Sequence, residues 1–143
     1  MIREKYVSPD TARLLKEKGF DEVCTQVYKD NGCLWDNAKI DGKWLTQEQL
    51  FSSECLAPTL QMTLDWLLTE HRLFVEIEIC KPYGAGKDRH AVPIDGVVYY
   101  PKIVWVDEWN HDLQEFKHQG LRTYETPEKA CAGAIDYCVY SII

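Results

Sequence analysis

A basic stretch offers the first candidates for binding chemistry. It contains Lys81, Lys87, Arg89 and His90 among glycines and prolines, and cations gathered in a loop are typical of sites that hold an anionic group. A nucleotide-binding loop is excluded, because that motif needs a glycine where Lys81 stands and a serine or threonine where Asp88 stands. A solvated loop is the favoured interpretation of this stretch, and an anion or partner contact at these four residues is the candidate that remains.

A pair of carboxylates offers the second candidate. Glu76 and Glu78 lie on the polar side of an alternating strand pattern over 73–80, and Tyr100 and Lys102 lie in the next strand pattern. Alternating glutamates are what the solvent side of a half-buried antiparallel strand contains, so we predict no catalytic residue. A small-molecule enzyme remains an alternative that would need a pocket gathering Glu76, Glu78, Tyr100, His90 or His111.

Six cysteines and four histidines raise the question of a metal site. No two cysteines are separated by the two to four residues that zinc sites use, and the histidines are scattered. The segment most similar to a metal site is the acidic stretch 107–112, in which residues with oxygen ligands lie next to His111 in the sequence. Cys131 and Cys138 lie two helical turns apart, too far for a disulfide. The sequence therefore predicts no metal, no cofactor and free thiols.

The composition predicts a folded, acidic protein. The chain has 143 residues, 45% of them hydrophobic and 27% charged, which suits one domain over 1–143. A net charge of −7 opposes a general nucleic-acid binder, since phosphate binding needs a positive surface. The charged start of the chain is unlike a signal peptide, and no apolar stretch is long enough to span a membrane. We expect a cytosolic protein.

Three helices are predicted, and each prediction rests on a proline near the start of the helix. In the first and last helix, the residue before this proline can cap the helix. Ser8-Pro9 begins a helix that Gly19 ends, Pro58 precedes a helix that runs to about Glu70, and Thr126-Pro127 begins the last. The second helix is expected to be buried on more than one side, with an inward row of Leu60, Leu64, Leu67 and Leu68 that Met62 and Trp66 widen.

The strands fall between these helices. The pattern over 22–35 predicts a hairpin turning at Asn31-Gly32, and 36–56 reads as loop with a second turn at Asp41-Gly42 and a short strand near 43–45. Strands are predicted over 73–80 and 97–106, with a short one at 121–124. Pro101 indicates an edge strand or a bulge. The fold class is α+β, an antiparallel sheet made of a hairpin and a two- or three-stranded meander, packed by about three helices.

Three segments carry a family resemblance. They are Tyr6 to Phe20, Ala57 to Leu67, and Tyr124 through the terminal helix. They resemble a family of small uncharacterised proteins of Bacteroides-group bacteria and of their phages and integrated elements. The resemblance covers most of the chain in matching order and departs from it in 36–56 and 81–96. It implies no activity, cofactor or site residue, and it implies a cytosolic accessory protein of a phage or mobile element.

The first functional interpretation is a non-enzymatic module that binds another protein or itself, as a homodimer. Five tryptophans and eight tyrosines are many for this length, and any that are exposed would favour protein binding. The apolar end 139–143 is a second candidate surface. The alternatives are a nucleic-acid-associated protein that uses the basic loop 81–90 and a small-molecule enzyme. The ligand, any reaction and the oligomeric state do not follow from the sequence.

Overall fold

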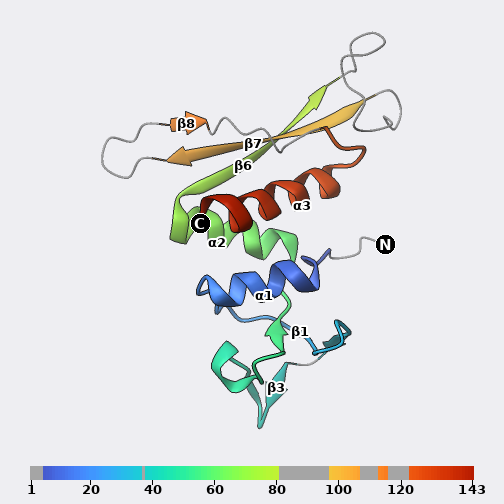
Figure 1. Ribbon diagram of the computed structural model, residues 1–143, viewed down its shortest axis with the longest axis vertical. Helices are drawn as coiled ribbons and strands as arrows, with labels where there is room; N and C mark the ends of the chain where they lie inside the picture. The colour runs from blue at the N-terminus through green and yellow to red at the C-terminus, as the bar shows by residue number, and fades with distance from the viewer. Residues whose placement is uncertain (1–4, 37, 81–96, 107–112, 116–122) are drawn as a thin grey trace. The chain divides into compact units, whose positions relative to one another are not determined.

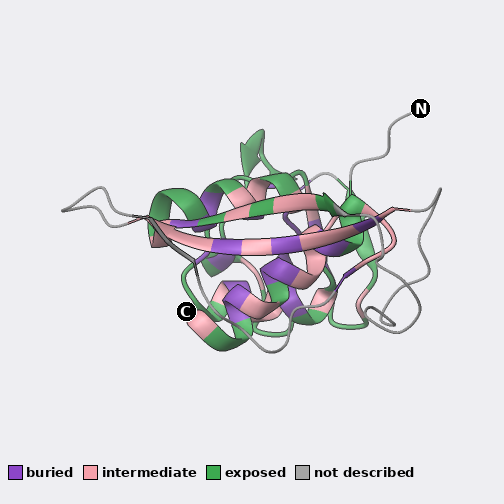
Figure 2. Ribbon diagram, turned by 90° about the horizontal axis from the view of Figure 1, so that it is seen from above, coloured by how far each residue is buried: buried purple, intermediate pink, exposed green. Residues whose placement is uncertain are grey.

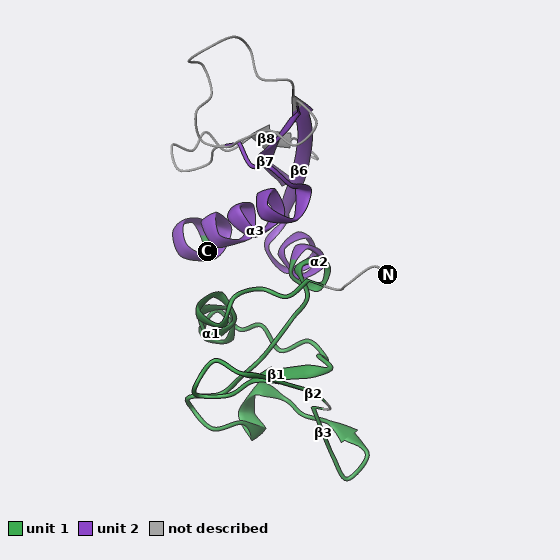
Figure 3. Cartoon of the chain, turned by 90° about the vertical axis from the view of Figure 1, so that its right-hand side faces the viewer, with its two compact units in different colours: residues 1–63, 143 green, residues 64–142 purple. Residues whose placement is uncertain are grey.

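The computed structural model describes residues 5–36, 38–80, 97–106, 113–115 and 123–143. Across these residues the protein is α+β, with three α-helices and small antiparallel sheets (Figure 1). Buried residues come from helices and strands alike (Figure 2). The chain divides into two compact units, residues 1–63 with Ile143 and residues 64–142 (Figure 3). One domain over 1–143 stays a prediction.

Helix α1 (Pro9–Glu17) begins and ends where the sequence predicts. The Ser8 hydroxyl accepts a hydrogen bond from the Thr11 N–H at 3.2 Å, which caps the first turn. Gly19 follows the helix with a φ of 95°, a conformation that costs other residues a steric penalty. Ala12 and Leu15 are fully buried, and α1 packs against β5 (Cys55–Leu56).

Strand β1 (Gln26–Tyr28) lies at the centre of an antiparallel sheet, between β2 (Leu34–Asp36) and β5. The predicted hairpin at Asn31-Gly32 is confirmed. The Lys29 N–H donates to the Cys33 carbonyl at 2.9 Å, and Gly32 has a φ of 82°. Its turn is a three-residue loop in which glycine supplies the left-handed conformation.

The segment 36–56, predicted to be mostly loop, contains more regular structure than expected. Strands β3 (Lys39–Ile40) and β4 (Lys43–Trp44) form a second hairpin. Asp41 and Gly42 both have positive φ, 53° and 77°, as a two-residue type I′ turn requires. A 3₁₀ turn, η1 (Gln47–Gln49), then begins after Thr46, whose N–H donates to Gln49 Oε1 at 2.8 Å.

Gln47 joins three segments of the first unit through a buried side chain. Its Nε2 donates to the Phe20 carbonyl at 3.0 Å, and its Oε1 accepts from the Leu56 N–H at 3.0 Å. Its own N–H donates to Asp21 Oδ1 at 2.9 Å. These bonds attach η1 to the chain that follows α1 and cover the outer edge of β5.

The boundary between the units falls within helix α2 (Leu60–His71). Thr63, Trp66 and Leu67 form its buried row. Leu68, predicted to face inward, is exposed, so the inward side is centred on this row and not on the row of leucines.

The second unit contains the predicted meander, with β6 (Leu73–Cys80), β7 (Val98–Val106) and β8 (Leu113–Glu115) in antiparallel order. β6 agrees with the prediction at both ends. The third strand is β8, and in the predicted range 121–124 Tyr124 forms a single bridge to Tyr99, while residues 121–122 lie outside the described part of the chain.

Pro101 lies in a central strand, where the sequence indicated an edge or a bulge. The local geometry explains why this is tolerated. Tyr99 exchanges hydrogen bonds of 2.8 Å with Tyr124, so its backbone groups face away from β6, and those of Pro101, two residues later, face the same way. β8 pairs only with 104–106. Proline therefore occupies a part of β7 where neither strand needs its missing N–H.

Helix α3 (Pro127–Tyr137) packs against β6 and β7, below them in Figure 1. The Thr126 hydroxyl accepts from the Lys129 N–H at 3.2 Å, which confirms the predicted cap. Gly133 lies against the Tyr124 ring so closely that a Cβ at this position would overlap the phenol. A π-helical segment, η2 (Cys138–Ile142), continues α3.

Candidate interaction surface

The predicted basic contact residues Lys81, Lys87, Arg89 and His90 lie outside the described residues. The acidic segment 107–112, with His111, does so as well. An anion or partner contact at these positions stays a prediction. Elsewhere in the described ranges, no three His, Cys, Asp or Glu side chains lie close enough together to hold a metal ion.

The carboxylates of β6 meet the residues that the sequence predicts. Glu76 pairs with Lys102 and Glu78 with Tyr100. Lys102 Nζ lies 2.6 Å from Glu78 Oε1, so Glu78 takes part in an ion pair. The only described histidine, His71, lies at the end of α2, with its ring 4.7 Å from that of Trp66. This face of the sheet therefore holds charges in register and no described acid–base pair.

Five cysteines of the described part of the chain are free thiols, namely Cys24, Cys33, Cys55, Cys131 and Cys138, and the first, third and fifth of these are buried. Burial raises the pKa of Cys138 to about 12 and, together with the nearby Glu22 and Asp21 carboxylates, that of Cys24 to about 12. Such thiols stay protonated at neutral pH and are poor nucleophiles. The side chain of Cys33 is exposed.

Large apolar side chains are exposed mainly in the first unit. Trp35 is 59% exposed and Phe51 77%, whereas Trp66 in α2 is 5% exposed. In the apolar end 139–143, Tyr140 is exposed and Val139 is fully buried. The exposed apolar residues of the first unit are Val23, Leu34, Trp35, Ile40, Trp44 and Phe51.

We use the name Trp35 surface for the exposed side chain of Trp35 together with that of Phe51. Trp35 lies opposite Val27 across the β1–β2 hairpin. Lys29 Nζ lies 4.9 Å from the centre of the Trp35 ring, a cation–π contact. Trp35 is therefore exposed but held by two neighbours, which reduces the rotamer entropy that a binding partner would have to remove.

An ion pair connects Trp35 to Phe51. Lys29 Nζ lies 2.9 Å from Glu54 Oε2, and the Phe51 N–H donates to Glu54 Oε1 at 3.3 Å. The hydrogen bond from Lys29 is the main reason that the pKa of Glu54 is lowered. On the helix side, Lys16 Nζ donates to the carbonyls of Glu54 at 2.8 Å and Phe51 at 3.3 Å. A series of polar contacts thus links the Trp35 ring, through Lys29 and Glu54, to the backbone of Phe51.

The outer edge of β2 is open within the described residues. Lys29 bonds to Cys33 at the turn, and because antiparallel pairs alternate, Trp35 also bonds to β1. The intervening positions, Leu34 and Asp36, therefore turn their backbone N–H and C=O groups away from β1. β2 is the last strand of its sheet on this side. The opposite edge, at β5, is covered by the side chain of Gln47.

The β3–β4 hairpin carries a second exposed tryptophan. Trp44 pairs with Lys39 across the hairpin, and Lys39 Nζ lies 4.3 Å from the centre of its ring. Ile40 is exposed beside the turn. Both exposed tryptophans of the first unit therefore carry a lysine over one ring face.

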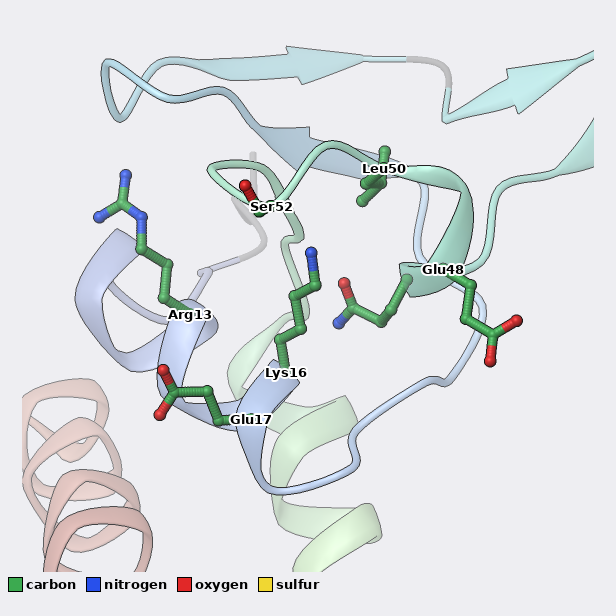
Figure 4. A pocket seen from close by; sticks show the side chains of 7 residues that line it. Arg13, Lys16, Glu17, Glu48, Leu50 and Ser52 are labelled. Atoms are coloured by element: carbon green, nitrogen blue, oxygen red, sulfur yellow. The ribbon is translucent and has the colours of Figure 1, made fainter.

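A pocket of about 540 Å³ lies between α1 and the segment that follows η1 (Figure 4). Lys16 points into it, and its ammonium is held by the two carbonyls of the 51–54 turn. The lining combines cations with carboxylates, so it has no single charge to select a ligand. Its residues are Arg13, Lys16, Glu17, Gln47, Glu48, Leu50 and Ser52.

Comparison with known proteins found no matching family model, curated protein or solved structure. In the part of the chain that the structure describes, none of the helices has the length and apolar character to span a membrane. The function is therefore inferred from the surface of the molecule.

The sequence did not distinguish the exposed Trp35 from the buried Trp66. A signal was present, because Trp66 belongs to a long apolar helix pattern whereas Trp35 follows a turn and precedes Asp36. A strand of three residues is too short for alternation to show which side faces the core.

Proposed function

We propose that the protein is a non-enzymatic interaction module that binds a protein partner through the Trp35 surface. The observation that supports this most directly is a tryptophan that is 59% exposed yet held by the hairpin and by Lys29. Tryptophan is among the residues most enriched at binding hot spots. A held, exposed ring costs little entropy to bury.

The neighbouring side chains extend this surface. Phe51 adds a second exposed ring, and its backbone N–H is linked to Trp35 through the Lys29–Glu54 pair. A hot spot is usually an apolar centre with a polar rim, and this ion pair supplies polar atoms beside the rings. The proposed setting is the one that the family resemblance implies, a cytosolic accessory protein of a phage or mobile element.

The test is a selection of binding peptides from a random displayed library against the wild-type protein. Selected peptides gather on surfaces that are suited to bind protein. We expect most of them to lose affinity by about tenfold or more when Trp35 is replaced by alanine. Phe74→Ala is the matched control, because Phe74 is an exposed aromatic residue in a strand of the second unit.

The measurement is made by fluorescence anisotropy with dilute protein, so that self-association does not compete. Peptides that bind Trp35→Ala and the wild type equally would contradict the proposal. A selection that enriches no peptide at all would contradict it as well. Circular dichroism of each variant shows whether its fold is intact.

A further inference from the structure

We infer that the partner of the Trp35 surface is a second copy of the same chain, joined through β2. The two β2 strands pair antiparallel about a two-fold axis at Trp35, which extends each three-stranded sheet into the other. This inference rests on the proposed function, since it names the occupant of the same surface.

The backbone geometry makes β2 complementary to itself. Leu34 and Asp36 direct their N–H and C=O groups outward, and they lie one residue to each side of Trp35. A two-fold axis at Trp35 places Leu34 of one copy opposite Asp36 of the other, twice. Each such pair exchanges hydrogen bonds in an antiparallel ladder. The outward groups of both strands are thereby satisfied without any change of register.

The side chains agree with this register. Trp35 meets its symmetry mate in a non-hydrogen-bonded pair, in which Cα atoms approach to about 4.5 Å and side chains are closest. Aromatic pairs at such positions are among the most stabilising cross-strand contacts. Lys29 covers one face of the ring and leaves its remaining surface available to the second copy.

The β5 edge of the sheet is less suited than the β2 edge to pair with a strand of the second copy. The N–H of Leu56 in β5 is already bonded to Gln47 Oε1, so a strand added there would first have to displace this side chain. No described side chain is bonded to the outward backbone groups of β2. An edge strand left open in this way is a template for another strand.

The dimer is expected to be weak. A strand of three residues with a few neighbouring side chains buries less than a standard interface, so Kd should lie between about 1 µM and 1 mM. Each copy carries a net charge of −7, so the copies repel each other and added salt should tighten the dimer. A dimer held by ion pairs would weaken with salt instead.

Sedimentation velocity over that concentration range tests the association with two variants at one position. Leu34→Pro removes an outward N–H and no bond to β1, and it should raise Kd by at least about tenfold, because the symmetric dimer loses that bond twice. Leu34→Thr keeps the N–H and a strand-forming side chain, and it should change Kd much less. Thermal unfolding of each variant reports whether the monomer is intact.

A cysteine at the axis tests the register without relying on proline. In a Cys33→Ser background, Trp35→Cys places two thiols at the distance that disulfides require, and mild oxidation should yield a covalent dimer. Wild-type Cys33 is the control. Two residues from the axis, it would lie about 13 Å from its symmetry mate along the strands and should not cross-link.

Three results would overturn the inference. They are a monomer at all concentrations, a dimer that Leu34→Pro does not weaken, and a wild-type protein that cross-links through Cys33 under the same mild oxidation. The peptide selection distinguishes these failures from failure of the proposed function. A monomer whose selected peptides depend on Trp35 would keep the interaction surface and replace the second copy with a foreign strand.

Discussion

Single residues hold the first unit together at points where the chain has little regular structure. Gln47 is the clearest example, because its side chain amide bonds to both Phe20 and Leu56 while it is nearly inaccessible to solvent. A buried amide with both ends bonded fixes the position of η1 without needing a long helix or strand.

We predict that Gln47→Ala lowers the free energy of unfolding by roughly 2–4 kcal/mol, because two buried backbone groups lose their partner. Gln47→Glu should cost a comparable amount, since a carboxylate cannot donate to the Phe20 carbonyl and its charge is buried. Glu48→Ala, at the next and exposed position, should change it by less than about 0.5 kcal/mol. Urea unfolding measures all three, and equal stability of Gln47→Ala and Glu48→Ala would contradict the role given to Gln47.

The Lys29–Glu54 pair predicts a dependence on pH. The pKa of Glu54 is lowered, chiefly by the hydrogen bond from Lys29. A carboxyl with a lowered folded-state pKa stabilises the protein above its unfolded pKa, and this contribution is lost as pH falls through the folded value. The difference in stability between wild type and Glu54→Gln should therefore shrink as pH falls from 7 to below about 4. A difference that stays constant in urea unfolding at each pH would count against this pairing.

At the scale of elements, the contact of α3 with the chain before it depends on a missing side chain. Glycine normally weakens the middle of a helix by about 1 kcal/mol relative to alanine. At Gly133 the sign should reverse, because a Cβ would overlap the Tyr124 ring. Glycine at this position leaves room for the ring of Tyr124, the residue that forms the bridge to Tyr99.

We predict that Gly133→Ala destabilises the protein by roughly 1–3 kcal/mol, the usual cost of overpacking. In a Tyr124→Ala background the same change should be neutral or stabilising by up to about 1 kcal/mol, since the obstruction is gone. A double-mutant cycle in thermal unfolding measures the coupling. Stabilisation by Gly133→Ala in the wild-type background would show that the ring moves aside without cost.

For the whole molecule, the question is whether the two compact units unfold together. Helix α2 is continuous across their boundary, and a helix interrupted at its middle loses the hydrogen bonds of several residues. We therefore expect one cooperative transition, as in most single domains of this size.

Cysteines provide the measurement, because buried thiols report each unit separately. Cys33 should react with a thiol reagent in the native protein, whereas Cys24 and Cys55 in the first unit and Cys138 in the second should be protected. Through a urea series followed by mass spectrometry, these three should become reactive at the same midpoint. Two separate midpoints would show that the units unfold independently.

The sequence by itself determined the features that depend on neighbouring residues. Ser8 and Thr126 cap their helices, Asn31-Gly32 and Asp41-Gly42 turn their hairpins, and alternation locates β6. Each rests on backbone dihedral preferences or on side-chain periodicity, which act within a few residues and can be read locally.

Only the tertiary structure decided which side chains are covered. Trp35 and Trp66 are chemically identical, yet one is exposed and the other buried, because burial depends on segments distant in the chain. The same reason applies to Gln47, whose partners Phe20 and Leu56 meet it only after folding. It applies also to β2, whose outer edge is open because β1 is its only partner among the described strands. Local preferences select the elements, and long-range packing selects the surface that remains available to a partner.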